Sequence, residues 1–314
     1  MTSTQLAWKI RRHAVEMTHL SGSSHIGSVL SVADIIAVLY TDILHFHPDD
    51  PHWKLRDRVI LSKGHACAAL YAALAEKGFF PTDELLTFYR NGCRLSGHAS
   101  HTVPGVDIST GSLGHGLGIG VGMAIAARQD RKHHRIFVIL GDGECNEGSL
   151  WESAQAAATY GLSNLTAIVD RNRLQSLDLC DRTQFSGSLT DKWRAFGWNT
   201  VELNGHDHDL LRKALSAEPS GKPNVIIANT VKGFQIPFME NNVLWHYRYP
   251  HSGWEYDCAV NALHQTKPEG IEDPYTPDGI PCPILPEYGV DWKKDYFMFS
   301  THHPTWYTVP EVSG

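Results

Sequence analysis

Hydrophobic residues in the first quarter of the chain recur mainly at helical spacing. Between residues 6 and 17 they stand three or four positions apart, which predicts an amphipathic helix that ends before the Ser-Gly-Ser-Ser turn at 21–24. Ser31 and Asp34 have the spacing of a capping box and precede an apolar run, so a second helix is expected to begin at Ser31. An alanine-rich stretch over 65–77 predicts a third helix.

Short apolar runs alternate with helical segments up to about residue 230. The runs that predict strands lie at 58–62, 135–140, 165–170, 198–203 and 225–230. Helices are predicted at 111–128, 147–160 and 207–217, and the closely spaced Gly and Ala residues of the first are typical of a backbone that approaches its neighbour. This alternation predicts an α/β fold, a doubly wound parallel sheet with helices on both faces, whose ligands bind beyond the carboxyl ends of the strands.

The composition changes near residue 264. The last 50 residues hold eight of the 16 prolines together with eight aromatic residues. Proline opposes regular structure, whereas aromatic residues argue against a freely solvated tail. We therefore expect one domain over 1–264 and an ordered, extended arm over 265–314 that packs on its own domain or on a partner.

Charge and cysteine content exclude several classes of protein. Lys and Arg total 27 against 34 Asp and Glu, and the net charge of −7 disfavours a nucleic acid partner. The six cysteines stand far apart with no C-x-x-C pair, which indicates reduced core thiols. The N-terminal segment lacks the apolar region of a signal peptide, and no run reaches the roughly 20 apolar residues that span a bilayer. A cytoplasmic protein without a membrane partner is expected.

Candidate chemistry appears where two neighbouring strands end. Gly141-Asp142-Gly143 follows one predicted strand and Asn172 follows the next. The Asp142 carboxylate, the Asn172 amide oxygen and a backbone carbonyl near Leu174 are hard oxygen ligands that suit Mg²⁺, with phosphate oxygens completing its octahedron. The glycines let backbone N–H groups approach those phosphates. Alone, the first motif is more often a tight turn, with Asn172 as a helix cap, but the pair predicts a site for a magnesium-bound diphosphate.

These motifs resemble the N-terminal, diphosphate-binding half of transketolase, and more closely the stand-alone subunit of split bacterial transketolases. The resemblance covers roughly residues 5 to 250. It implies thiamine diphosphate as the cofactor, with Mg²⁺, or Ca²⁺ or Mn²⁺ in its place, held by Asp142, Asn172 and the Leu174 carbonyl. Gly141 and Gly143 belong to the same cofactor motif.

The resemblance extends to four histidines, which stand in the contexts Ser-His-Ile-Gly, Ser-Lys-Gly-His, Leu-Ser-Gly-His and Trp-His. It implies that His25 faces the reactive carbon of the cofactor and the substrate oxygen, and that His98 binds donor hydroxyl groups. It implies that His65 contacts the diphosphate and that His246 lies near both diphosphate and substrate. Since proton transfer suits groups that titrate near neutrality, pKa values around 6 to 7 are expected for the cluster. Any single histidine beside glycines is as often a core or capping residue.

Further elements of the resemblance concern the cofactor ring and the subunit boundary. Gly111 and Leu113 match the segment that lines the aminopyrimidine, and Glu147 matches a glutamate that couples two active sites, although it is equally an ordinary charge in the first turn of a helix. The sequence departs from the family pattern at Ser112, His115 and Arg171.

The resemblance implies a transferase that moves a two-carbon ketol unit from a ketose to an aldose, with sugar or sugar phosphate substrates. About 60 residues follow the last motif, too few for a second α/β domain. We therefore expect a C-terminal transketolase subunit with the pyrimidine-binding domain as a separate partner, in an α2β2 hetero-oligomer. Two alternatives are a non-catalytic scaffold member of the family and a 2-oxo-acid dehydrogenase-like α subunit.

Overall fold

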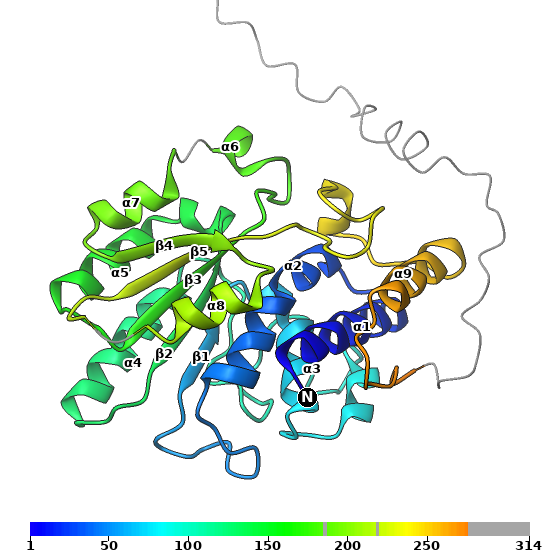
Figure 1. The fold of residues 1–314 in the computed structure, drawn as a ribbon, viewed down its shortest axis with the longest axis horizontal. Coiled ribbons are helices and arrows are strands. Elements are labelled where there is room, and N and C mark those ends of the chain that lie inside the picture. Colours follow the sequence, from blue (N-terminus) through cyan, green and yellow to red (C-terminus); the bar gives the residue numbers. More distant parts are fainter. Residues whose placement is uncertain (185–186, 218–219, 276–314) are drawn as a thin grey trace, which may run out of the picture.

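A five-stranded parallel sheet forms the centre of the molecule. The computed structural model describes residues 1–184, 187–217 and 220–275 (Figure 1). The strand order is β1-β2-β3-β5-β4, and every neighbouring pair is parallel. The strands are β1 (Arg58–Leu61), β2 (Ile136–Gly141), β3 (Leu165–Arg171), β4 (Asn199–Asn204) and β5 (Asn224–Asn229). Each of the five predicted strands is present.

Helices cover both faces of this sheet, as predicted for a doubly wound fold. The side chains of β1, β2, β3 and β5 alternate between two cores, so that in β2 Phe137 and Ile139 face one and Val138 and Leu140 face the other. The first core is completed by α1, α2, α3, α8 and α9, and the second by α4, α5 and α7. The helices are α1 (Ser3–Ser21), α2 (Ile26–Val38), α3 (Cys67–Glu76), α4 (Gly116–Gln129), α5 (Gly148–Thr159), α6 (Cys180–Thr183), α7 (Leu189–Ala195), α8 (His208–Leu215) and α9 (Trp254–Gln265).

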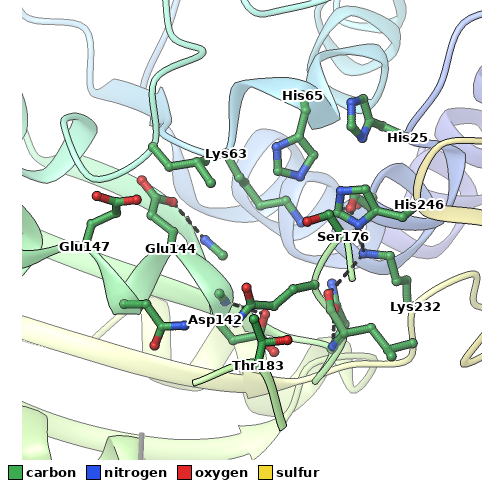
Figure 2. Close-up of a pocket in the computed structure, with 18 of the residues that line it drawn as sticks. His25, Lys63, His65, Asp142, Glu144, Glu147, Ser176, Thr183, Lys232 and His246 are labelled. Atoms are coloured by element: carbon green, nitrogen blue, oxygen red, sulfur yellow. Dashed lines mark hydrogen bonds between the residues drawn. The ribbon is translucent and has the colours of Figure 1, made fainter. Parts of the chain in front are cut away.

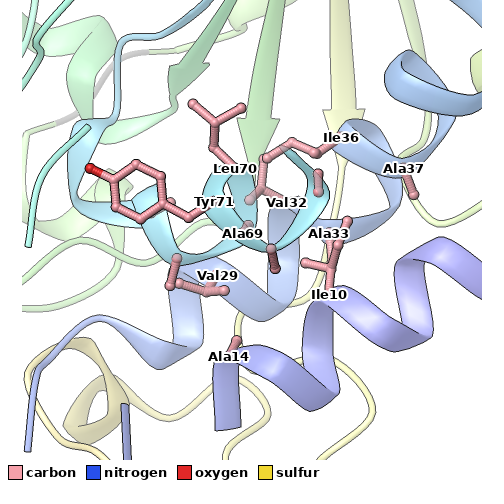
Figure 3. Packing of buried hydrophobic residues seen from close by; sticks show 14 of the residues in the cluster. Ile10, Ala14, Val29, Val32, Ala33, Ile36, Ala37, Ala69, Leu70 and Tyr71 are labelled. Carbon is pink, nitrogen blue, oxygen red and sulfur yellow. The ribbon is translucent and has the colours of Figure 1, made fainter. Parts of the chain in front are cut away.

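The N-terminal helices pack on one another through small and branched side chains. Figure 3 shows Ile10 and Ala14 of α1 against Ala33 and its neighbours in α2, with Ala69 of α3 beside them. One helical stretch among the described residues, Ile26–Ile43, is long and apolar enough to cross a membrane, and 89% of it is buried inside the molecule. Packing against the surrounding helices accounts for its composition.

The predicted start of the second helix is wrong. Helix α2 begins at Ile26, so Ser31 and Asp34 lie in its interior and are buried. Neither side chain caps a helix end. The Ser31 hydroxyl donates a hydrogen bond to Asp170 at 2.6 Å, and Asp34 binds Arg11. Tertiary partners explain these polar residues, and spacing along the chain does not reveal such partners.

The glycine-rich helix also begins later than predicted. Helix α4 starts at Gly116, and residues 111–115 form the loop before it. The expected close approach is present further along: a Cβ atom on Gly120 would lie 2.6 Å from Cγ2 of Val138 in β2. The small residues of α4 thus serve contact with the sheet.

Helix α9 and the first residues of the predicted arm contact helix α1. The Trp8 indole N–H donates to the Leu263 carbonyl of α9 at 2.7 Å. In the arm, the Glu269 carbonyl accepts a hydrogen bond from the Gln5 side chain at 2.9 Å, and Asp273 forms a buried ion pair with Arg12 at 2.9 Å. Residues 276–314, most of the predicted arm, lie outside the described residues, as does Cys282. The other five cysteines are free thiols; Cys67 and Cys145 are buried, and the remaining three are half-buried.

Packing at Gly120 leads to a stability prediction. Gly120→Ala places its methyl group against a β-branched, buried side chain that cannot rotate away, and it should destabilise the fold by about 1–3 kcal/mol. Gly122→Ala in the same helix is the matched control, because a Cβ atom there has no neighbour within 4 Å. Its higher helix propensity should stabilise the fold by about 0.5–1 kcal/mol. Denaturant unfolding of both variants checks the pair; equal effects would contradict the assigned packing.

Candidate functional site

The carboxyl ends of β1, β2, β3 and β5 open into one cavity of about 510 Å³ (Figure 2). Its wall contains all the residues predicted for the site, namely His25, His65, His98, Gly111, Leu113, Gly141, Asp142, Gly143, Glu147, Asn172, Leu174 and His246. These residues come from segments more than 200 positions apart in the chain. The parallel topology brings them to one edge of the sheet.

Asp142 and Asn172 stand at the ends of β2 and β3. The backbone at 173–174, directly after β3, donates hydrogen bonds to both side chains. The Asp142 carboxylate accepts hydrogen bonds from two backbone N–H groups, including that of Arg173 at 2.5 Å. The amide oxygen of Asn172 accepts one from the backbone of Leu174 at 3.2 Å. Burial, followed by the negative charge of Asp170, raises the pKa of Asp142. A nearby cation would therefore stabilise the charged form of this carboxylate.

The third predicted metal ligand, the Leu174 carbonyl oxygen, accepts a hydrogen bond from Lys232 Nζ at 3.1 Å. The same ammonium group contacts Ser28 Oγ at 3.3 Å and His246 Nδ1 at 2.9 Å. Because an ammonium group can only donate, Nδ1 of His246 is unprotonated and the neutral ring carries its proton on Nε2. Burial, and then repulsion from Lys63, lowers the pKa of Lys232 to about 8.

The predicted ligand set is of the kind that Mg²⁺ uses. Among the described residues, no three His, Cys, Asp or Glu side chains gather closely enough to hold a metal ion by themselves. Asp142, Asn172 and the Leu174 carbonyl provide one carboxylate and two neutral oxygens. Mg²⁺ typically takes one or two carboxylates and leaves its other positions to water and phosphate.

Two lysines at the strand ends were missed by the sequence analysis. Lys63 follows β1 and donates to Asp170 at 2.5 Å, and Lys232 follows β5. Asp170 also accepts hydrogen bonds from the Ser31 and Thr230 hydroxyl groups. Burial opposes the charge of Asp170, but Lys63 holds its pKa below the ordinary value. The sequence contained a signal for both lysines, since Lys63 directly follows the predicted strand 58–62 and Lys232 stands two residues after the predicted strand 225–230, at the edge where ligands bind.

His25 lies at the centre of the histidine cluster. The ring centroids of His65, His246, Tyr247 and His98 lie 4.9, 5.2, 5.4 and 6.4 Å from its own. Its backbone has a φ of +76°, and its N–H group donates to the His246 carbonyl at 3.1 Å. Strained backbone of this kind is common at functional sites. The buried Nδ1 atom of His25 has no hydrogen-bond partner among the described residues.

The expected pKa values of 6 to 7 are wrong for three of the four rings. Burial, followed by nearby positive or titrating groups that include Lys63 and Lys232, lowers the pKa of His25 to about 4 and that of His246 to about 3. The same causes place the pKa of His65 well below its ordinary value. All three rings are therefore neutral at pH 7. A bound anion would raise these pKa values, because it offsets the charge of the two lysines.

A buried carboxylate that the sequence analysis did not identify fixes the loop that carries Gly111 and Leu113. Glu144 accepts hydrogen bonds from the backbone N–H groups of Gly114 at 2.8 Å and Gly141 at 3.0 Å. Burial raises its pKa. Glu144 thus joins the loop before α4 to the end of β2, and its acidic character alone gave no indication of this role.

The three departures from the family pattern are not among the residues that line the cavity, although Ser112 stands between two that do. Arg171 Nη1 donates to Glu202 of the edge strand at 2.7 Å. Ser112 and His115 are exposed, and His115 stands at the start of α4 without a side-chain capping bond. The role of His115 stays open.

Glu147 directly precedes α5 and lines the cavity.

The cavity wall includes further side chains that were not predicted, among them Gln175, Ser176, Thr183, Gln184 and Tyr247. Tyr247 is 60% exposed and directly follows the predicted site residue His246. Its place in the cavity wall could therefore have been predicted from the sequence. The others lie between β3 and α7, in the loops around α6 and in α6 itself, where no periodicity or motif marked them.

Comparison with known proteins yields a consistent family match. The family described as "Transketolase, thiamine diphosphate binding domain" matches residues 2–247. The chain is 40% identical over 259 residues to one of the subunits of an apulose-4-phosphate transketolase from Phocaeicola vulgatus, covering 82% of this chain and 92% of that protein. It is 40% identical over 240 residues to 6-deoxy-6-sulfo-D-fructose transketolase subunit SqwG of a Clostridium species, covering 76% and 87%.

Solved structures show the same relationship. A transketolase from Campylobacter jejuni matches with a TM-score of 0.78 and 29% identity, covering 84% of this chain and 42% of that one. A transketolase from Leishmania mexicana matches with a TM-score of 0.77 and 30% identity, covering 84% and 41%. The chain thus spans about two fifths of the length of these solved transketolases.

The lowered pKa values lead to a prediction about pH. His25 and His246 should stay neutral as the pH falls well below 6.5, in the protein without cofactor, because burial and the lysines oppose their protonation. Unfolded histidines take up protons first, so the free energy of unfolding should decrease as the pH falls from about 6.5 to about 4. NMR titration of the ring protons measures the midpoints of His25 and His246. Midpoints between 6 and 7 for His25 and His246 would contradict the assigned environment.

Proposed function

The chain belongs to the transketolase family, and we propose that it is the thiamine diphosphate-binding subunit of a two-chain transketolase. Such an enzyme transfers a two-carbon ketol unit from a ketose donor to an aldose acceptor. The observation that carries the proposal is the convergence of four strand ends on one cavity that contains the metal-ligand set and the four histidines. A cytoplasmic location is part of the proposal.

The residues present fit a diphosphate bound to a divalent cation. Lys63 has Asp170 as its counter-ion, whereas Lys232 contacts neutral acceptors, so the cavity favours an added anion. The raised pKa of Asp142 favours an added cation beside it. Together these two features suit a ligand that carries both charges. We propose that the cation is Mg²⁺, with Ca²⁺ or Mn²⁺ as substitutes.

Thiamine diphosphate supplies a nucleophilic thiazolium carbon and an electron sink when it is bound. Lys63, Lys232 and His65 would hold its diphosphate, and Asp142, Asn172 and the Leu174 carbonyl would hold the cation. Gly111 and Leu113 would line the cofactor ring. The proximity of these groups fixes the reacting atoms in place before the substrate arrives.

Proton transfer is assigned to His25 and His246. In the neutral rings, Nδ1 of His246 is occupied by Lys232, which leaves its Nε2–H as the donor. His25 has an unpartnered Nδ1 and lies within 5.2 Å of the His246 ring, so the two can act on the same substrate oxygen. His98, whose ring lies further out and is exposed, is assigned to donor hydroxyl groups.

The partner is proposed to be a separate chain with the pyrimidine-binding domain. Two of the relatives are named as subunits of transketolases, and each is matched over most of its length. Their names refer to a sugar phosphate and a sulfo sugar, which supports a sugar or sugar phosphate as substrate here. An α2β2 assembly is the proposed stoichiometry.

Removal of the predicted metal-ligating carboxylate should abolish cofactor binding. Asp142→Ala leaves the cation with neutral ligands, and we expect its affinity for thiamine diphosphate with Mg²⁺ to fall by more than the roughly 10- to 100-fold that loss of an outer partner costs. Arg171→Ala is the matched control, because its side chain pairs with Glu202 away from the cavity. Isothermal titration calorimetry measures both. Wild-type affinity in Asp142→Ala would refute the metal site.

A transfer assay tests the function itself. The chain is co-expressed with a candidate partner and supplied with a panel of ketose donors and aldose acceptors. We expect two-carbon transfer that requires both chains, and His25→Ala should reduce kcat by about 100-fold or more with cofactor affinity little changed. A chain that binds no thiamine diphosphate at millimolar concentration with Mg²⁺ would instead support the scaffold alternative.

A further inference from the structure

His206 holds the segment that carries Lys232 at two points. It lies in the turn between β4 and α8, and its Nε2 atom accepts a hydrogen bond from the Val231 N–H group at 2.9 Å. Its ring stacks on Phe234 with centroids 3.5 Å apart and planes at 13°. Because Val231 and Phe234 flank Lys232 in the chain, both contacts restrain the same short segment.

A buried carboxylate fixes His206 in turn. Nδ1 of His206 lies 2.6 Å from Asp34, which also binds Arg11 and His208. Since Val231 donates to Nε2, the proton of the neutral ring resides on Nδ1 and is donated to Asp34. Asp34 remains charged despite its burial, because Arg11 and the two histidines hold its pKa well below the usual range.

We propose that His206 is a positioning residue for the cofactor, acting through Val231 and Phe234 on the Lys232 ammonium group. The inference rests on the proposed function, in which Lys232 binds the diphosphate. Lys232 is buried and approaches three acceptors, so a small displacement of its backbone moves its charge relative to the bound anion. The histidine matched no motif in the sequence, and the turn that carries it comes from the edge strand of the sheet.

The chain offers a matched control for this role. His208 binds the same carboxylate of Asp34 at 2.9 Å and is also largely buried, but its other ring nitrogen bonds to Ser3. His206→Ala and His208→Ala each leave Asp34 with Arg11 and one histidine, so both variants should fold. In His206→Gln, the amide oxygen can accept the Val231 hydrogen bond again.

The test measures binding by calorimetry in the full chain, with two probes: inorganic diphosphate alone, and thiamine diphosphate with Mg²⁺. Loss of one hydrogen bond and one stacked ring should raise the Kd of His206→Ala for both probes by about 10-fold. His208→Ala should stay within about twofold of the wild type, and His206→Gln within about threefold. The amide resonance of Val231 should shift in His206→Ala and remain near its wild-type position in His208→Ala.

The outcomes separate this inference from the proposed function. Wild-type affinity in His206→Ala, or equal weakening in the two alanine variants, would overturn the positioning role and leave the function untouched. A wild-type chain that binds inorganic diphosphate but not thiamine diphosphate with Mg²⁺ would overturn the function, and the comparison of variants with inorganic diphosphate would still decide the role of His206. A wild-type chain that binds neither probe would overturn both.

Discussion

The geometry of the cavity depends on one buried carboxylate. Asp170 is fully buried at the end of β3, where it binds Lys63 from the end of β1, Ser31 from α2 and Thr230 from the end of β5. Three elements that are far apart in the sequence therefore meet at one side chain. Loss of one partner in a buried ion pair leaves an uncompensated charge and typically costs about 3–5 kcal/mol. The strand ends and the helix beneath them are consequently held in a fixed arrangement.

Two aspartates at neighbouring strand ends have opposite electrostatic environments. Asp170 has Lys63 as its counter-ion and a lowered pKa, whereas Asp142 lies beside Asp170 and has a raised pKa. Identical side chains thus have different surroundings, which suit Asp170 to a structural role and Asp142 to the ligand-binding role that we propose for it. The negative charge of Asp170 also adds to the potential that attracts a cation to Asp142.

Sequence patterns predicted most of the sheet because β1, β2, β3 and β5 are largely buried and appear as apolar runs, whereas the edge strand β4 is half-buried or exposed. They also predicted that Asp142 and Asn172 would meet, since adjacent parallel strands share one edge. They failed at Ser31 and Asp34, where local spacing suggested a helix cap and distant partners determine the structure. The lowered histidine pKa values could not be predicted from the sequence either. They depend on burial and on Lys63 and Lys232, which only the folded chain brings to the cavity.

The ion pair between Arg12 and Asp273 has a consequence for what counts as the domain. The family match ends at residue 247, yet Leu263 and Asp273 satisfy polar groups of α1 that are buried in the interior. A chain shortened to the recognisable family segment would leave the indole of Trp8 and part of the charge of Arg12 without acceptors. The residues after position 247 hold α1 in place through these contacts. The unit that folds as one domain is therefore larger than the region by which the family is recognised.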